Sequence, residues 1–433
     1  YSEHTKRFEE VEKIRDELKL PIATLLDTKG PEIRLGNFKD PAGVIIKSGD
    51  TFTLTTKECE GDETRSYVNY DGLPKDVKAG TTILINDGII SLQVNHVAGT
   101  DIVCTVVDGG RLTDHKGVNV PGVELNMPYL SQKDMNDLSY GAKMGFDFIA
   151  ASFCRSATDI TVMRNYLEAI GWKNAKIIAK IENAQGVANI DEILDAADGI
   201  MVARGDMGVE IPFEQIPAIQ KELIRKAYNA GKNVITATQM LESMITNARP
   251  TRAEITDVAN AIYDGSSAIM LSGETAAGKY PVEAVKTMSL IAETTEKDID
   301  YISRFKKRAD ERNSSITDAI SHATVTTAHD LNAVAILTVT KGGTTARTLS
   351  KFRPNCPIIA LTTDDTTYHQ LSLSWGIRAG VIEEKTNTDE LIRHALERSV
   401  ELGYLKKGDL VVITAGVPLG MSGTTNLLKV ERA

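Results

Sequence analysis

The sequence predicts an α/β protein built on a barrel of parallel strands, with a small all-β unit inserted into it and a second α/β unit after it. The main observation is a run of four strand-like segments between Lys176 and Glu274, each ending in polar residues. The first three begin as apolar runs rich in Ile and Val and are followed by amphipathic helical segments, which is typical of parallel β/α units. The length of 433 residues exceeds the roughly 250 of a (β/α)8 barrel, so further domains are expected.

Six segments have the character of barrel strands: 21–28, 146–153, 176–183, 199–206, 233–240 and 268–275. A closed barrel of this kind has eight strands, so the sequence predicts a TIM barrel whose first two strands are absent from this chain. Residues 1–19 precede the first of the six and are expected to form a helix with one apolar stripe. The carboxyl ends of parallel strands gather on one rim of such a barrel, where the active site lies.

Short alternating runs between Gly36 and Gly122 predict the inserted all-β unit. Three turn pairs, Asp71-Gly72, Asp87-Gly88 and Asp108-Gly109, divide these runs and are expected to close hairpins. Further along, Ser131 to Asp134 and Thr251 to Glu254 have the capping-box pattern that begins a helix.

A charged run at 298–315 is expected to mark a domain boundary. Beyond it, strand-like segments at 333–340, 357–363, 378–383 and 409–416 alternate with helical ones and predict a small open sheet. The predicted domains are residues 1–36 and 122–300 for the barrel, 37–121 for the inserted unit and 315–433 for the C-terminal α/β unit.

Composition argues against several classes of function. The net charge is −10 and the lysines and arginines are dispersed, so no nucleic-acid or anionic-membrane surface is expected. The four cysteines form no CxxC pair and the seven histidines show no HxxxH spacing, so zinc and a disulfide framework lack support. No long apolar run or signal sequence is present, which favours a cytoplasmic location and small-molecule partners.

Charged residues at the strand ends predict a metal-dependent site. Lys180 and Glu182 are two apart on one strand and face the same side, while Asp206 ends the next strand. Two carboxylates from neighbouring strand ends suit Mg²⁺ or Mn²⁺, and Lys180 would face the anion that the metal holds. The alternative is a plain Lys180–Glu182 ion pair, which is disfavoured because both residues lie in a buried apolar strand.

A loop of the C-terminal unit, LTVTKGGTTAR (337–347), places threonines and glycines between a strand and a helix N-terminus, where they predict a cradle for a phosphate group. Its candidate effector-binding residues are Thr338, Thr340, Lys341, Gly342, Gly343, Thr344 and Thr345. The Walker pattern is absent. The glycine-rich loop 416–426 is expected to be mobile and to close over the cradle. The alternative is that both loops are ordinary βα turns.

Long motifs spread over nearly all of the chain carry a resemblance to a known family. LDTKGPEIR, AKIEN, GIMVARGDMGVEIP, TATQMLESM, RPTRAE and MLSGETAAGKYPVEAV follow the order of the pyruvate kinase family, which the sequence closely resembles. The resemblance implies a (β/α)8 barrel, a β-barrel lid inserted after the third barrel strand and a C-terminal regulatory domain. It implies phosphoryl transfer from phosphoenolpyruvate to ADP, giving pyruvate and ATP in the last step of glycolysis, by a cytoplasmic, allosteric, bacterial-type homotetramer. Because the family begins with two further strands, the expectation is either that this sequence is incomplete at its N-terminus or that the molecule is truncated.

The same resemblance implies catalytic roles for single residues. It makes Glu182 and Asp206 the ligands of Mg²⁺ or Mn²⁺, and Lys180 the group that stabilises the transferring phosphoryl group and the developing enolate. Arg34 resembles the phosphate-binding arginine of the family. Lys116 resembles a lid lysine that meets the nucleotide, although on its own it would be assigned to a solvated surface.

Substrate and potassium contacts are implied in the same way. The resemblance assigns contacts to phosphoenolpyruvate to Ala203, Arg204, Gly205, Asp206 and Thr238, and a part in the proton route to Ser272. Asp27 and Thr28 resemble two K⁺ ligands. In this family a glutamate at the position of Glu32 goes with potassium dependence, whereas the alternative is that Glu32 merely pairs with Arg34. A sugar phosphate such as fructose 1,6-bisphosphate, or AMP, is the implied effector.

Two other functions remain open at this stage. Metal-dependent lyases and mutases that bind phosphoenolpyruvate or pyruvate use the same barrel, since fold alone does not fix the reaction. A non-catalytic, metabolite-sensing protein that binds ligands through the 338–345 loop is the third hypothesis. The inserted lid, Arg34 and the C-terminal unit favour the kinase over the lyases and mutases. Intact Lys180, Glu182 and Asp206 argue against the sensing protein, whereas the missing N-terminal strands argue for it if the molecule is truncated.

Overall fold

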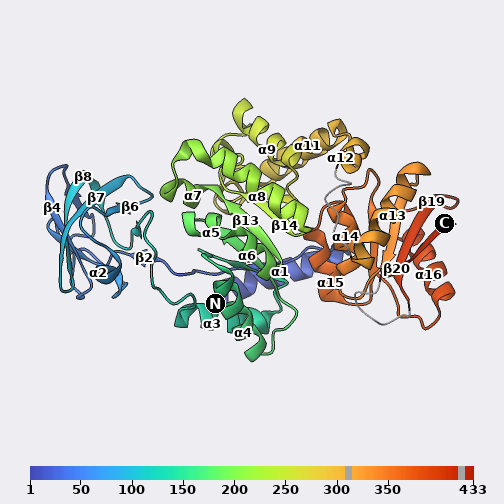
Figure 1. Ribbon diagram of the computed structural model, residues 1–433, viewed down its shortest axis with the longest axis horizontal. Helices are drawn as coiled ribbons and strands as arrows, with labels where there is room; N and C mark the ends of the chain where they lie inside the picture. The colour runs from blue at the N-terminus through green and yellow to red at the C-terminus, as the bar shows by residue number, and fades with distance from the viewer. Residues whose placement is uncertain (308–314, 418–424) are drawn as a thin grey trace.

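The computed structural model describes residues 1–307, 315–417 and 425–433. Figure 1 shows three parts in a row: a β-rich part at the left, a central sheet surrounded by helices, and a second α/β part at the right. The β-rich part is inserted between two segments of the central part, so the chain passes between these parts twice. None of the described helices combines the length and the apolar character needed to cross a lipid bilayer.

Among the described residues the central sheet has six parallel strands, in the order β1-β11-β12-β13-β14-β15. They are β1 (Leu25–Asp27), β11 (Phe148–Ala151), β12 (Lys176–Ile181), β13 (Gly199–Ala203), β14 (Asn233–Ala237) and β15 (Ala268–Ile269). Each lies within one of the six segments predicted as barrel strands. The parallel order confirms the predicted α/β class of this part.

Helices follow the strands, as the sequence predicts. They are α1 (Ser2–Leu18), α3 (Gln132–Met144), α4 (Ala157–Ala169), α5 (Ala184–Ala188), α6 (Ile190–Ala196), α7 (Arg204–Glu210), η1 (Phe213–Gln215), α8 (Ile216–Ala230), η2 (Glu242–Ile245), α9 (Arg252–Asp264), α10 (Gly273–Ala276), α11 (Pro281–Asp298) and α12 (Tyr301–Lys307). Both predicted capping boxes are present, at the start of α3 and of α9. The stripe predicted on the first helix is only partly buried: Phe8 packs inward, whereas Ile14 and Leu18 are exposed among the described residues.

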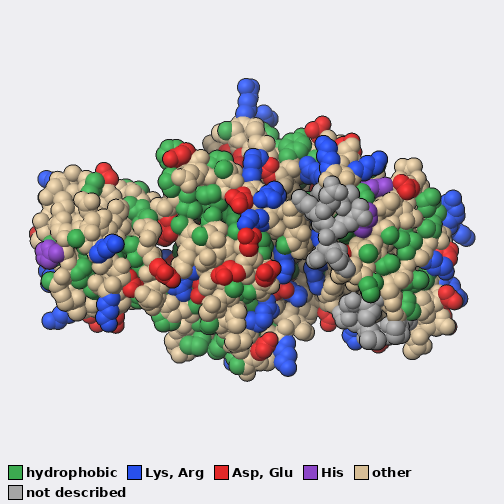
Figure 2. Space-filling view, viewed as in Figure 1, with side chains coloured by type: hydrophobic (Ala, Val, Ile, Leu, Met, Phe, Trp, Pro, Cys, Tyr) green, Lys and Arg blue, Asp and Glu red, His purple; other side chains and the backbone are tan. Residues whose placement is uncertain are grey.

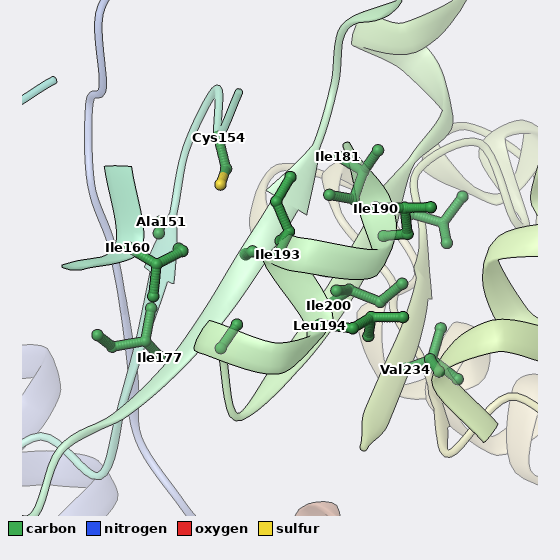
Figure 3. Packing of buried hydrophobic residues seen from close by; sticks show 14 of the residues in the cluster. Ala151, Cys154, Ile160, Ile177, Ile181, Ile190, Ile193, Leu194, Ile200 and Val234 are labelled. Carbon is green, nitrogen blue, oxygen red and sulfur yellow. The ribbon is translucent and has the colours of Figure 1, made fainter. Parts of the chain in front are cut away.

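Side chains of β12 alternate between two cores. Ile177 and Ile181 face the surrounding helices, and Figure 3 shows them in one cluster with Ile193 of α6. Ile178 belongs instead to the cluster on the inner side of the sheet. Since side chains alternate along a strand, Lys180 continues the inward series of Ile178. The strand therefore buries apolar residues over most of its length and presents its charge at the carboxyl end.

The β-rich part is a sheet of seven strands among the described residues, in the order β2-β10-β6-β7-β8-β4-β5, with β3 and β9 as a separate pair. The strands are β2 (Ile33–Arg34), β3 (Val44–Ile46), β4 (Thr51–Thr55), β5 (Arg65–Tyr67), β6 (Thr82–Ile85), β7 (Ile90–Ala98), β8 (Asp101–Asp108), β9 (Gly110–Leu112) and β10 (Gly117–Asn119), and α2 (Leu73–Asp76) is its helix. A bridge between Leu35 and Val68 joins the chain after β2 to the chain after β5. This bridge closes the sheet into the predicted small barrel.

Only one of the three predicted hairpin turns is a hairpin. Asp87-Gly88 lies between the paired strands β6 and β7, as expected. Asp71-Gly72 instead precedes the helix α2, and Asp108-Gly109 carries the chain from β8 into β9, which pairs with β3. A Cβ at Gly109 would lie 2.4 Å from the Ile46 carbonyl oxygen, so the glycine is needed for close backbone approach rather than for a hairpin.

The C-terminal part is a five-stranded sheet, counted over the described residues, in the order β18-β17-β16-β19-β20. Its elements are α13 (Ile316–Asp330), β16 (Ala335–Val339), α14 (Thr344–Lys351), β17 (Ile358–Thr362), α15 (Asp365–Gln370), η3 (Leu371–Leu373), β18 (Ile377–Val381), α16 (Thr388–Glu401), β19 (Leu410–Gly416) and β20 (Thr425–Arg432). The four predicted strands are present and parallel. The edge strand β20, which pairs antiparallel with β19, was not predicted.

Candidate active site

Lys180 is the centre of the polar groups at the carboxyl ends of the strands. Its Nζ lies 3.1 Å from Glu182 Oε1, 3.2 Å from Asp27 Oδ1 and 3.0 Å from Ser152 Oγ. Burial disfavours the charge on Lys180, but Glu182 and Asp27 outweigh it and raise the pKa of the amine above its ordinary value. A protonated amine is therefore fixed where β1, β11 and β12 end.

Glu182 and Asp206 carry more negative charge than their surroundings neutralise. Glu182 is 2% exposed and accepts a 2.6 Å hydrogen bond from the Phe153 backbone N–H. Burial raises the pKa of Glu182 to about 7; Lys180 opposes this shift and Asp206 adds to it. Partial burial also raises the pKa of Asp206. A cation between the two carboxylates would stabilise their charged forms.

This donor set fits a magnesium or manganese ion. Among the described residues, no group of three or more His, Cys, Asp or Glu side chains is arranged to hold a metal ion. Mg²⁺ characteristically binds through one or two carboxylates and completes its shell with water and substrate phosphates. Two hard oxygen donors beside an open cleft match that preference.

Ser152 connects the two residues that were predicted to bind potassium. Its Oγ lies 3.0 Å from Asp27 Oδ1 and 2.7 Å from the Thr28 carbonyl oxygen, and its N–H donates to Thr28 Oγ1 at 3.1 Å. Gly30 allows this approach, because it has a φ of 71° and a Cβ there would lie 2.8 Å from the Ser152 carbonyl oxygen. Sequence reasoning recognised the strand at 146–153 but did not single out Ser152, which directly follows the last residue of β11. Its hydroxyl at a strand end was the available signal.

Arg34 and Glu32 form a two-fold hydrogen-bonded ion pair. Arg34 Nε lies 2.8 Å from Glu32 Oε2, Arg34 Nη2 lies 3.1 Å from Glu32 Oε1, and Arg34 Nη1 donates to the His115 carbonyl at 2.9 Å. The hydrogen bond that Arg34 donates to Glu32 raises the pKa of Arg34. The pairing considered as the alternative role of Glu32 is therefore present in the structure.

The Arg204 side chain stabilises the turn that carries Thr238. Its Nη2 donates to the Thr238 carbonyl at 2.6 Å, and its Nη1 lies 2.6 Å from Asp257 Oδ2. Thr238 and Gln239 both have positive φ, at 66° and 54°, a backbone conformation that costs energy for residues other than glycine. The guanidinium of Arg204 therefore holds a strained turn, while its backbone, at the junction of Ala203 and α7, remains at the rim.

Thr238 and Gly205 are brought together, as the sequence predicted for neighbouring strand ends. The Gly205 N–H donates to Thr238 Oγ1 at 2.9 Å, and that hydroxyl donates to the Ala237 carbonyl at 2.6 Å. Ser272, after β15, has a buried Oγ without a hydrogen-bond partner among the described residues. A buried hydroxyl in this state is available to a ligand.

Glu274, which sequence reasoning did not single out, joins two loops of the rim. It is fully buried, and it accepts hydrogen bonds from the Leu241 N–H at 2.9 Å and the Ser272 N–H at 2.8 Å. The carboxylate thereby fixes the loop after β14 to the loop after β15. It is a positioning residue for Ser272.

Glu274→Ala is expected to destabilise the protein by about 3 kcal/mol, because one buried and one partly buried N–H group lose a charged acceptor. The loss is measured as a shift in the urea unfolding midpoint. Glu283→Ala, at an exposed position of α11, is the control and should shift the free energy by less than about 0.5 kcal/mol. Equal stability of the two variants would show that Glu274 does not hold the loops.

A cleft of about 790 Å³ lies between the lid and the barrel in front of these residues. Figure 2 shows the narrow waist between the left and central parts, with acidic side chains around it. Arg34 and Lys116 line the cleft on the lid side, and Asp206 lines it on the barrel side. The predicted lid lysine and the predicted metal ligand therefore face one space, which is large enough for a nucleotide.

The predicted phosphate cradle has an ordered turn. Thr340 Oγ1 accepts from the Gly343 N–H at 3.0 Å, and Gly343 has a φ of 78° just before α14 begins at Thr344. Thr338 Oγ1 is buried without a partner among the described residues. Thr345 Oγ1 lies 2.6 Å from Thr425 Oγ1. Lys341 is exposed and follows Thr340 in the same turn, with Gly342 next. Of the loop 416–426, residues 418–424 lie outside the described residues.

Comparison with known proteins identifies the family to which this chain belongs. A profile described as "Pyruvate kinase, barrel domain" matches residues 1–285, and one described as "Pyruvate kinase, alpha/beta domain" matches residues 318–431. Curated pyruvate kinases of Clostridium acetobutylicum and Geobacillus stearothermophilus are 49% and 50% identical over 100% of this chain, covering 91% and 74% of their own lengths. A solved pyruvate kinase structure from Cryptosporidium parvum has a TM-score of 0.93 at 38% identity, over 100% of this chain and 88% of that one.

Proposed function

Because this chain belongs to the pyruvate kinase family, we propose that its phosphotransferase reaction takes place around Lys180, in the cleft between lid and barrel. The reaction of the family moves the phosphoryl group of phosphoenolpyruvate to ADP, giving pyruvate and ATP. The observation that carries this placement is the buried Lys180 amine, held between two carboxylates and a hydroxyl at the strand ends.

Phosphoryl transfer depends mainly on positioning and on neutralising charge. The bond between phosphorus and the enol oxygen breaks, a bond to a terminal oxygen of ADP forms, and the enolate that remains takes a proton at carbon. Lys180 would face the phosphoryl and enolate oxygens, while Arg34 and Lys116 would face the phosphates from the lid side of the cleft. A fixed cation stabilises charge that develops during the reaction without having to reorganise.

Glu182 and Asp206 would hold the Mg²⁺ or Mn²⁺ ion. When bound, the metal acts as a Lewis acid and as a template for the phosphoryl and enolate oxygens. The Phe153 N–H fixes the orientation of Glu182, so that one carboxylate oxygen is committed to the backbone and the other to Lys180 and the site.

The carboxylate of phosphoenolpyruvate would lie against the backbone of Ala203, Arg204 and Gly205 and beside the Thr238 hydroxyl. The positive φ of Thr238, maintained by the Arg204 side chain, sets where this hydroxyl points. The unpartnered Ser272 hydroxyl would relay the proton that the enolate takes up. Glu274 keeps that hydroxyl in place by binding the Ser272 N–H.

Asp27 and Thr28 would bind K⁺ beside the phosphate site. Asp27 offers a carboxylate, Thr28 a hydroxyl and a carbonyl, and the Ser152 hydroxyl hydrogen-bonds to both residues. A cation at this place would add positive charge where the phosphates gather. Glu32, two residues before Arg34, would set the dependence on this ion.

Glu32→Lys is expected to retain activity in the absence of K⁺, since its ammonium would supply the missing charge. The measurement compares rates in K⁺ and in a bulky organic cation at equal ionic strength. Glu32→Gln is the matched control, because it breaks the ion pair with Arg34 without adding a cation, and it should still need K⁺. Full activity of the unmodified protein without K⁺ would end the proposal.

The 338–345 loop would bind the phosphate of a sugar-phosphate effector, and the assembly would be a homotetramer. The ordered turn at Thr340 and Gly343 and the unpartnered Thr338 hydroxyl support the loop. The tetramer rests on family membership alone.

A metal-dependent lyase or mutase is the alternative activity, and ATP formation coupled to consumption of phosphoenolpyruvate and ADP decides between them. Consumption of phosphoenolpyruvate without ATP would reject the kinase assignment.

A further inference from the structure

A second pocket lies at the opposite end of the barrel strands from the active site. It has a volume of about 450 Å³, and its wall includes Lys176 and Asn233, which are the first residues of β12 and β14. The other wall comes from α14 of the C-terminal part. The two walls are in contact, because a Cβ added at Gly231 would lie 3.0 Å from the Lys351 side chain. This space, here called the foot pocket, therefore lies between the barrel and the C-terminal part.

The lining of the foot pocket is strongly basic. It carries four cationic side chains and two carboxylates: Lys176, Lys232, Arg347, Lys351, Asp198 and Asp318. Both carboxylates are already paired. Asp198 lies 3.3 Å from Lys176 and 3.1 Å from Arg164, and Asp318 lies 3.2 Å from Lys351. Both carboxylates of the pocket are thus paired with Lys176, Arg164 or Lys351. The other two cationic side chains of the lining have no carboxylate partner in the described part of the chain.

Those two cations are Lys232 and Arg347. Lys232 Nζ donates to the Ala197 carbonyl at 2.8 Å, and Arg347 Nη2 donates to the Gly342 carbonyl at 2.5 Å. Neither has a carboxylate within 4.0 Å among the described residues. Burial lowers the pKa of both groups, which reflects the cost of holding charge there. Charges that are partly removed from water are normally paired or bound to a counter-ion, so this arrangement favours a bound anion.

The foot pocket adjoins the phosphate cradle of the 338–345 loop but has a largely different lining. Thr344, Arg347, Thr348 and Lys351 follow the spacing of one helix face, and all four line the foot pocket. Thr345 points elsewhere, to Thr425 of β20. Lys341 does not line the pocket. Thr344 is the one cradle residue that also lines the foot pocket, and Arg347 donates to the carbonyl of Gly342 in the cradle, so the two sites adjoin while the rest of their linings differ.

We propose that the foot pocket binds a small phosphomonoester, with its phosphate between Lys232 and Arg347. A dianion matches the two cations that lack carboxylates, and a guanidinium binds phosphate through two parallel hydrogen bonds. The volume lies within the range of small-molecule sites and leaves room for a polar group beyond the phosphate, beside Thr348 and Gln370. The ligand would bridge the barrel and the C-terminal part.

Equilibrium dialysis with radiolabelled inorganic phosphate tests the proposal, with ionic strength held constant by sodium chloride. The Lys232→Gln/Arg347→Gln double variant is expected to lose one phosphate site per chain. Lys232→Gln alone should weaken that site at least tenfold, and Lys232→Arg should keep it. Lys341→Gln, which alters the cradle, and Lys180→Met, which alters the active site, should both retain it.

Phosphate binding that is unchanged in the double variant would overturn the proposal, as would a loss caused by Lys341→Gln instead. If the double variant does not fold, the comparison of Lys232→Gln with Lys232→Arg decides, and equal binding by these two variants rejects the site. Glycerol 3-phosphate should displace the labelled phosphate from the site, whereas glycerol should not. Failure of glycerol 3-phosphate to compete would reject the phosphomonoester.

Discussion

Lys180→Met is expected to lower the turnover number by roughly a thousandfold or more, with little change in the affinity for metal and phosphoenolpyruvate. The Lys180 amine is held by Glu182, Asp27 and Ser152 before any substrate arrives, so it acts chiefly on charge that appears during phosphoryl transfer. Methionine has a similar length and shape but no charge. Steady-state rates, together with binding of phosphoenolpyruvate measured directly, separate the two effects.

Lys226→Met provides the matched control, because Lys226 lies on α8 and pairs with Asp191 on the outside of the barrel. It should retain nearly the full turnover number. A loss below tenfold in Lys180→Met would remove this residue from the mechanism. A large loss of phosphoenolpyruvate affinity with unchanged turnover would assign it to binding instead.

Glu182→Gln and Asp206→Asn are expected to lower the rate at limiting magnesium by about a hundredfold or more, and added magnesium should partly restore it. Each substitution removes one negative charge while keeping the shape of the side chain. Glutamine at position 182 can still accept the hydrogen bond from the Phe153 N–H, so the fold should persist. The rate as a function of magnesium concentration, and Mn²⁺ binding followed by electron paramagnetic resonance, are the measurements.

Asp191→Asn is the control for charge removal, since its carboxylate lies on the exterior against Lys226. It should leave the magnesium dependence unchanged. If extra metal does not restore activity in Glu182→Gln or Asp206→Asn, and Mn²⁺ binds them as tightly as the unmodified protein, the two carboxylates are structural.

The sequence was sufficient to predict the barrel strands and the charged residues at their ends. Apolar runs define β12 to β14, and the two-residue spacing of Lys180 and Glu182 places both on the inner side of one strand. These features depend on local pattern alone. The same holds for the capping boxes, in which the residues that bond are three apart.

Contacts between distant segments were beyond sequence reasoning. Glu274 binds the Leu241 N–H across 33 positions, and Arg204 reaches Asp257 across 53. No local pattern distinguishes such side chains from exposed ones. The hairpin errors have a related cause, because an Asp-Gly pair fits several kinds of turn and only the strand that pairs next selects among them. The strand β20 was missed for the same reason, because its formation depends on pairing with β19.

The strand β12 has different chemistry at its two ends. Lys176 at its start lines the foot pocket, and Lys180 near its end faces the reacting groups. The two lie about 13 Å apart at the usual rise of an extended strand. Parallel pairing with β11 on one side and β13 on the other fixes the register of β12 in the sheet. Since misplacing a reacting group by about 1 Å costs on the order of a hundredfold in rate, the register of β12 between its two neighbours sets the alignment of Lys180.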